Sequence, residues 1–334
     1  MNARSQLHKR AQNTMNTWAL VLAAGEGSRL KSLTTTHTGV AVPKQFCSLH
    51  GGPSLLQEAL YRAEAVAPRQ RICTIVAEQH RRWWEGPLWS LNASNIIVQP
   101  ENRGTANGLL LPLLHIAQRD PDARVVILPS DHYVRDEATL GRALRQAAAK
   151  VTEKSETVYL LGIGPDEVDP ELGYIVPGTR DANDSLHVSE FVEKPSMTLA
   201  RALLERGALW NAFILVAAVR TLIELFEQRF HGITSEMRRA VRQDAGDSEN
   251  AIATAELYDR LPDLDFSRDI LEGSESLLRV HPVPPCGWSD LGTPRRVAEA
   301  LRRLPQESHS SNRPILPAAH LSLAAQHARL QMAV

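Results

Sequence analysis

The chain has 334 residues, with 37 Lys and Arg against 38 Asp and Glu, which gives a formal net charge of −1. This balance disfavours nucleic acid or anionic lipid as the main partner, because both attract proteins with a basic excess. With 43% hydrophobic and 22% charged residues, the composition is typical of a globular protein. The longest apolar runs, such as Ile214–Val219, are far shorter than a bilayer span. No membrane-spanning helix is expected.

The first sixteen residues are basic and lack the apolar stretch of a secretory signal. Residues 1–16 are therefore predicted to be a disordered leader. The three cysteines, Cys47, Cys73 and Cys286, are widely separated and form no C-x-x-C pair. This usage favours a reducing cytoplasm over a zinc site or a disulfide framework.

Strands and helices alternate in the first half of the chain. Strands are predicted at Trp18–Leu22, Ile72–Val76, Asn95–Val98 and Val125–Leu128, and helices at Pro53–Ala67, Thr105–Gln118 and Glu137–Val151. This order predicts βαβ units around a parallel sheet. The expected fold is therefore α/β, with a Rossmann-like doubly wound sheet.

The second half has more strands in succession. They are predicted at Val158–Ile163, Tyr174–Val176, Val188–Val192 and Leu209–Val216, with helices at Thr198–Arg206, Val219–Phe230 and Thr293–Leu304. Such an order favours an antiparallel or mixed extension that carries a substrate pocket. Residues 305–334 read as a linker and a C-terminal amphipathic helix. That helix could dock on its own chain or on the second subunit of a homodimer, and the sequence leaves both open.

A glycine turn follows the first strand, in the segment Leu22–Leu30 (LAAGEGSRL). Gly25 and Gly27 allow backbone N–H groups to approach an anion at the carboxyl end of a strand. The dinucleotide fingerprint would need a third glycine where Leu30 stands, and the G-K-[ST] of a P-loop is absent. Both of those nucleotide-binding classes are disfavoured.

The stretch from Gly27 to Gln57 contains no Asp or Glu, although about three to four would be expected at the frequency of the chain. It carries Arg29, Lys31 and Lys44 instead. A loop with cations and no carboxylate suits a polyphosphate. It also lacks the acidic residue with which a nicotinamide enzyme binds the ribose, which makes an oxidoreductase a distant alternative.

Seven short motifs, in order from about Leu20 to Val297, resemble those of the sugar-nucleotide pyrophosphorylases. They are LAAGEGSRL with VPKQF, QPENRGTANGLLLPL, LPSDH, ELGYIVPG, FVEKP, WNAFI and GWSDLGT. The PKQF form is close to that of the mannose-1-phosphate guanylyltransferases. The resemblance implies a mixed-sheet, GT-A-like nucleotidyltransferase domain over residues 17–304. Residues 17–155 would form the nucleotide-binding half and residues 156–304 the sugar-binding half.

Three departures from the family pattern stand out. The stretch between Arg29 and Pro43 is longer than usual, with Ser32 in place of proline. Ala212-Phe213 replaces a Ser-Gly pair, and the loop at residues 102–104 is altered. These changes leave the expected catalytic positions in place and concern the choice of base and sugar.

The resemblance also implies roles for individual residues. The catalytic residues would be Arg29, Lys44, Asp131 and Lys194; the nucleotide would contact Ala24, Gly25, Gly27, Ser28, Gln99, Arg103, Gly104 and Thr105; and the sugar would contact Gly173, Tyr174, Glu193 and Asn211. Asp131 and Asp290 would bind Mg²⁺, which needs only one or two carboxylates besides phosphate oxygens and water. Asp131 could instead cap a turn, and Thr105 and Asn107 could cap the helix that follows them.

The expected reaction is the attack of a sugar-1-phosphate on the α-phosphorus of a nucleoside triphosphate, most simply mannose-1-phosphate and GTP giving GDP-mannose and pyrophosphate. It needs positioning and charge neutralisation rather than a protein nucleophile. The alternatives are a glucose-1-phosphate uridylyl- or thymidylyltransferase and a non-catalytic sugar-nucleotide sensor of the same fold. Retention of the five charged positions Arg29, Lys44, Asp131, Lys194 and Asp290 favours an enzyme over a sensor.

Overall fold

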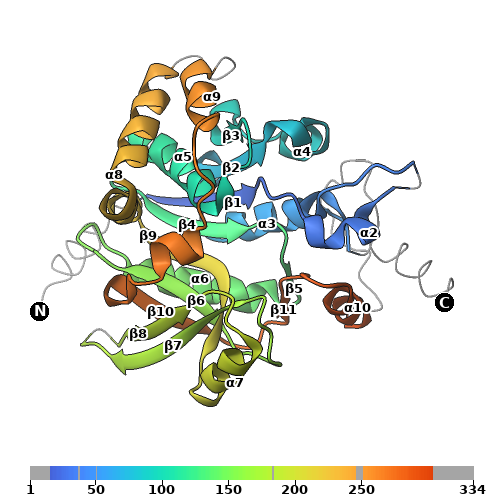
Figure 1. The fold of residues 1–334 in the computed structure, drawn as a ribbon, viewed down its shortest axis with the longest axis vertical. Coiled ribbons are helices and arrows are strands. Elements are labelled where there is room, and N and C mark those ends of the chain that lie inside the picture. The colour runs from blue at the N-terminus through green and yellow to red at the C-terminus, as the bar shows by residue number, and fades with distance from the viewer. Residues whose placement is uncertain (1–15, 37, 50, 183, 246–250, 304–334) are drawn as a thin grey trace, which may run out of the picture.

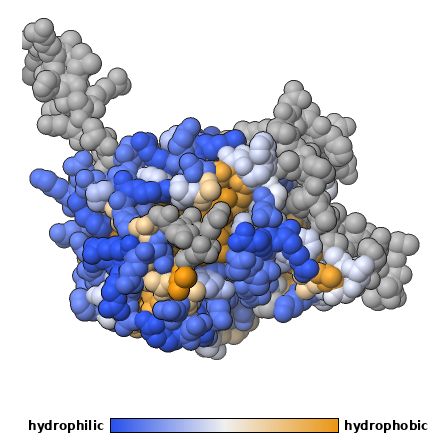
Figure 2. Space-filling view, turned by 90° about the horizontal axis from the view of Figure 1, so that it is seen from above, coloured by the Kyte–Doolittle hydropathy of each residue, from blue (hydrophilic) through white to orange (hydrophobic). Residues whose placement is uncertain are grey.

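The computed structural model describes residues 16–36, 38–49, 51–182, 184–245 and 251–303. The predicted leader, apart from Asn16, and the predicted C-terminal linker and helix lie outside these residues. Within them, no helix combines the length and the apolar character that a bilayer crossing requires. The face seen in Figure 2 is mostly hydrophilic, with apolar residues confined to smaller areas.

One nine-stranded sheet forms the centre of the molecule, in the order β3-β2-β1-β4-β9-β6-β10-β8-β7. The first four strands are β1 (Thr17–Ala23), β2 (Ile72–Ala77), β3 (Ile96–Gln99) and β4 (Arg124–Pro129). They are parallel to one another, and β2 and β4 are buried along their whole length. Burial on both faces explains their continuous apolar sequences. The predicted doubly wound α/β fold is confirmed.

The second half of the sheet is mixed. It contains β6 (Val158–Ile163), β7 (Gly173–Arg180), β8 (Leu186–Val192), β9 (Leu209–Ala218) and β10 (Leu278–Val283). Strand β9 is antiparallel to both β4 and β6, and its first residues also pair with β7. This extra pairing places Gly173 opposite Asn211. The mixed extension predicted for this half is therefore present, and β9 joins it to the parallel half (Figure 1).

Helices cover both faces of the sheet. They are α2 (Lys31–Thr34), α3 (Leu55–Glu64), α4 (Arg81–Leu88), α5 (Gly104–Arg119), α6 (Glu137–Lys150), α7 (Met197–Glu205), α8 (Val219–Gln243), α9 (Ile252–Tyr258) and α10 (Pro294–Arg302). Alternate residues of β1 enter different cores: Ala19 and Val21 pack on the side of α3 and α6, and Leu20 on the side of α5 and α8. Helices α5 and α8 lie side by side in Figure 1.

Local signals explain most helix boundaries. Ser54 and Gln57 form a reciprocal capping box at the start of α3, and Asp136 and Thr293 cap α6 and α10. The helix predicted to end at Phe230 continues to Gln243, with a break in the backbone at Phe230. The sequence interpretation missed β10, α4 and α9, as well as the small sheet of β5 (Tyr133–Val134) and β11 (Trp288–Ser289).

Candidate active site

A cleft of about 390 Å³ lies at the carboxyl ends of β1 and β3. This is the edge of a parallel sheet where ligands bind, and the volume is within the range of small-molecule sites. One wall comes from the glycine turn, the end of β3 and the start of α5, and the other from the segment 263–269. The cleft brings together five of the predicted nucleotide contacts: Ala24, Gly25, Gln99, Gly104 and Thr105.

Gln99, the last residue of β3, contributes a buried hydrogen-bond acceptor to this cleft. Its side chain is 2% exposed, and its Oε1 atom has no hydrogen-bond partner among the described residues. Gly108 allows α5 to pass close by, since a Cβ atom at Gly108 would lie 3.2 Å from Oε1. A buried acceptor without a partner costs free energy in the unliganded protein, and a ligand that donates to it would recover that cost.

Arg103 differs from the prediction, because it does not line the cleft. Its Nε donates to the Tyr258 carbonyl at 2.9 Å, and its guanidinium pairs with Glu101 at 2.8 Å. Arg103 therefore anchors the end of α9, and its contact with a nucleotide stays a prediction. Thr105 does not cap α5 either: its hydroxyl accepts a hydrogen bond of 2.8 Å from the backbone N–H of Phe266.

The glycine turn is held against the loop that carries Lys44. Gly27 has a φ of +60°, and a Cβ atom there would lie 2.9 Å from the backbone nitrogen of Lys44. The side-chain amide of Gln45 donates to the carbonyls of Ala23 and Gly25, at 3.1 and 2.8 Å. Gln45 belongs to the PKQF motif, whose resemblance to the family implied no role for this residue. It fixes the shape of the turn.

Arg29 lies at the same turn, and its side chain is largely exposed to solvent. Its side chain is 52% exposed, and its only ion pair in the described residues is a 3.5 Å contact with Glu171. The guanidinium is thus free to meet an anion. Ser28 lies in the same short helical turn, Ser28–Leu30, and its side chain is outside the described part of the structure.

Lys44 is the buried centre of the site. Its ammonium group lies 3.0 Å from Oδ2 of Asp131 and donates a 2.7 Å hydrogen bond to the backbone carbonyl of Asp290. Partial burial would raise the pKa of Asp131, but the charge of Lys44 and its hydrogen bond lower that pKa to about 2. Asp131 is therefore ionised at neutral pH.

His132 is a neighbour of Asp131 in the site. Burial lowers the pKa of His132 to about 4, so the ring is neutral at pH 7. The indole N–H of Trp288 donates to Nδ1 at 3.3 Å, which leaves the proton on Nε2, 3.6 Å from Asp131. The ring packs edge-on against Trp288 of β11 and lies beside Asp131.

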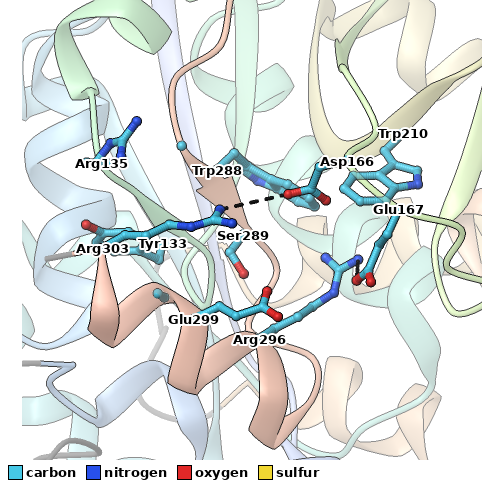
Figure 3. Close-up of a pocket in the computed structure, with 12 residues that line it drawn as sticks. Tyr133, Arg135, Asp166, Glu167, Trp210, Trp288, Ser289, Arg296, Glu299 and Arg303 are labelled. Atoms are coloured by element: carbon cyan, nitrogen blue, oxygen red, sulfur yellow. Dashed lines mark ion pairs between the residues drawn. The ribbon is translucent and has the colours of Figure 1, made fainter.

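Asp290 follows β11 and is buried, with one carboxylate oxygen accepting a 2.9 Å hydrogen bond from Arg296. The same guanidinium lies 2.7 Å from Asp169 and 4.8 Å from the ring centre of Trp210. Figure 3 shows Arg296 and Trp210 at the edge of a second pocket, which measures about 30 Å³. That volume is far below the range of substrate sites. We therefore interpret this region as one that holds Asp290 in place through Arg296.

The predicted sugar residues gather around Gly173, at the start of β7. A Cβ atom at Gly173 would lie 2.5 Å from Oε2 of Glu193 and 3.2 Å from Cβ of Asn211. Burial, together with the nearby carboxylate of Asp265, raises the pKa of Glu193 to about 7. Lys194, with a φ of +49°, places its ammonium group 3.8 Å from Glu193.

Tyr174 does not join this cluster. Its side chain is fully buried, and its hydroxyl bonds the backbone of Asp169 as both donor and acceptor. The ring alternates to the core side of β7, so it is unavailable to a sugar. Tyr174 is a structural residue, which corrects the prediction.

The family model of the nucleotidyl transferases matches residues 18–307. The chain belongs to this family, which confirms the class that the sequence motifs predicted. The mannose-1-phosphate guanylyltransferase of Escherichia coli K12 is 30% identical over 286 residues, which are 83% of this chain and 58% of that protein. The protein of the same name from Sinorhizobium fredii NGR234 is 29% identical over 283 residues, which are 82% of this chain and 52% of its own length.

A solved structure is similar as well. It is the crystal structure of a Thermus thermophilus protein named mannose-1-phosphate geranyltransferase, with a TM-score of 0.71 and 29% identity, and the match covers 88% of this chain and 81% of that one. The chain spans about half the length of the curated relatives it matches.

Proposed function

We propose that this protein transfers a nucleotidyl group from GTP to mannose-1-phosphate, giving GDP-mannose and pyrophosphate. The observation that carries the proposal is the segment 263–269, which borders both halves of the site. Asp265 lines the cleft that contains Gln99, and its negative charge also raises the pKa of Glu193. Ser267 lies 3.5 Å from the side-chain nitrogen of Asn211. The nucleotide and sugar sites therefore share a wall, as direct transfer between two bound substrates requires.

In this reaction an oxygen of the sugar phosphate attacks the α-phosphorus in line. The bond between the α-phosphorus and the oxygen that bridges to the β-phosphorus breaks, and pyrophosphate leaves with that electron pair. The exposed guanidinium of Arg29 neutralises the triphosphate, and Lys194 neutralises the incoming phosphate. Glu193 accepts hydrogen bonds from sugar hydroxyls, and Lys44 fixes Asp131 and the backbone at Asp290.

The residues present fit a magnesium ion. Asp131 is ionised and its side chain is 38% exposed, so oxygen ligands are available beside the glycine turn. The described residues contain no group of three or more His, Cys, Asp or Glu that could hold a metal alone. Asp131 and Asp290 would therefore bind Mg²⁺ together with phosphate oxygens and water. When bound, the ion would neutralise charge on the phosphates.

The test is a pyrophosphate-release assay of the purified protein with Mg²⁺, over a matrix of four triphosphates and several sugar-1-phosphates. We expect the highest kcat/KM for GTP with mannose-1-phosphate. A maximum for UTP or dTTP with glucose-1-phosphate would support the alternative transferase. Binding of a nucleotide sugar with no turnover in any pair would support a sensor, and either result would overturn the proposal.

A further inference from the structure

The second wall of the nucleotide cleft is strongly charged. Asp263, Asp265, Arg268 and Asp269 all line it, in the same cleft as Gln99, whose Oε1 has no hydrogen-bond partner among the described residues. The sequence motifs gave this segment no role, although it places three carboxylates within seven residues. A carboxylate wall facing a buried acceptor offers a ligand several hydrogen-bond acceptors.

This wall is fixed to the start of α5 by backbone contacts. The carbonyl of Leu264 accepts a 2.9 Å hydrogen bond from the N–H of Ala106, and its own N–H donates to the Arg103 carbonyl at 3.3 Å. Gly104, with a φ of +79°, makes the approach feasible, because a Cβ atom there would overlap the Leu264 carbonyl oxygen. The wall is therefore held against the start of α5, which lines the same cleft as Gln99.

The three carboxylates differ in what they already bind. Asp265 accepts a hydrogen bond from the Arg268 N–H at 3.0 Å, and Asp269 accepts one from the Asp265 N–H at 2.6 Å. These two cap the π-helical turn Phe266–Leu271. Asp263 is exposed and makes no hydrogen bond or ion pair with a described residue. It is the carboxylate of this wall that is free to bind a ligand.

Charge decides which part of a nucleotide meets this wall. The three carboxylates of this wall outnumber its one cation, Arg268, and repel a triphosphate. The cations Arg29 and Lys44 lie outside the residues that line the cleft. The triphosphate is therefore placed toward those cations, at the Gly25 end. The base or the ribose would then contact Asp263 and Gln99.

We propose that Asp263, with Oε1 of Gln99, selects guanine by accepting hydrogen bonds from its N1–H and exocyclic amine. This inference rests on the proposed function. Guanine alone presents two adjacent donors on one edge, which match the two oxygens of a carboxylate. Adenine and cytosine place an acceptor nitrogen beside their amine, and uracil and thymine flank one N–H with two carbonyls. All four would set an acceptor against Asp263.

The test compares GTP with ITP, whose hypoxanthine base keeps N1–H but lacks the amine. With mannose-1-phosphate as acceptor, we expect the wild type to favour GTP in kcat/KM by at least about tenfold, since the loss of a hydrogen bond to a charged carboxylate has an effect of that order. Asp263→Asn keeps the shape and offers one acceptor, so the GTP/ITP ratio should fall below about threefold. Asp259→Asn, an exposed aspartate outside the cleft lining, should leave the ratio unchanged.

A third nucleotide distinguishes the base from the ribose. The ratio of GTP to dGTP should be the same in the wild type and in Asp263→Asn. A change in that ratio, or equal use of GTP and ITP by the wild type, would overturn the inference while leaving guanylyl transfer intact. If the wild type instead used UTP or dTTP in preference to GTP, the proposed function itself would be wrong. Thermal unfolding of both variants checks that the fold is retained.

Discussion

The ammonium group of Lys44 donates a 2.7 Å hydrogen bond to the backbone carbonyl of Asp290, 246 positions further along the chain. The same group pairs with Asp131 at 3.0 Å. One buried cation therefore joins the loop after the glycine turn, the end of β4 and the segment after β11. Three of the charged residues expected in the site, Lys44, Asp131 and Asp290, lie at these three places.

Replacing Lys44 by Ala should lower kcat by at least about a hundredfold, because charges fixed at a reacting centre act mainly in the transition state. The pKa of Asp131 should also rise from about 2 once the neighbouring cation is gone. Pyrophosphate release measures the first effect, and titration of Asp131 by NMR the second. Lys154→Ala, at an exposed turn, serves as the matched control. Wild-type turnover in Lys44→Ala would remove its proposed role.

Replacing Arg296 by Met should lower the free energy of unfolding by about 3–5 kcal/mol, because it leaves the carboxylates of Asp290 and Asp169 buried without their cation. Its neighbour Arg295 is the matched control: its side chain is 55% exposed and pairs with Glu167 and Glu299 at the surface. Arg295→Met should lower the free energy of unfolding far less, because exposed ion pairs contribute little to stability. Urea unfolding measures both, and equal losses in the two variants would argue against the buried network.

Gly104→Ala should raise KM for the nucleotide and lower the free energy of unfolding by at least about 1 kcal/mol. The added methyl group would meet the Leu264 carbonyl and shift the wall that carries Asp263. Gly164→Ala is the control, since a Cβ atom added there would have no heavy atom within 4 Å beyond its chain neighbours. Steady-state kinetics with varied GTP and urea unfolding test the pair. An unchanged KM in Gly104→Ala would show that the wall does not touch the nucleotide.

Glu193 should make stability depend on pH. Its pKa is about 7 in the folded protein against an ordinary value of 4.5, so the folded state holds this proton more tightly than the unfolded chain. The contribution of Glu193 to the unfolding free energy is therefore greatest below pH 4.5 and is lost as the pH rises through 7. The loss is at most about 3 kcal/mol.

Glu193→Gln removes this titration. The free energy of unfolding of the variant, minus that of the wild type, should be larger at pH 8 than at pH 5. Urea unfolding at the two pH values measures the difference. If the difference in unfolding free energy between the two proteins is the same at pH 5 and pH 8, Glu193 titrates at its ordinary pKa.

The sequence determined the parallel half of the fold because its signals are local. A buried strand such as β4 is continuously apolar, and caps such as Ser54 and Asp136 mark helix starts within a few residues. The glycine turn and the acid-free stretch after it also predicted an anion site without any tertiary information. A cleft lies beside that turn, and anion binding there stays a prediction.

Only the tertiary structure decided which side chains share a site. Sequence order does not show that Arg103 is held by α9, that Tyr174 points into the core, or that Asp263 and Gln99 line the same cleft. Each of these outcomes depends on contacts between segments far apart in the chain. The orientation of a side chain is set by those contacts, through burial and the satisfaction of buried polar groups, and a motif specifies only which residue is present. The residue types for the chemistry are therefore visible in the sequence, and their arrangement is a property of the fold.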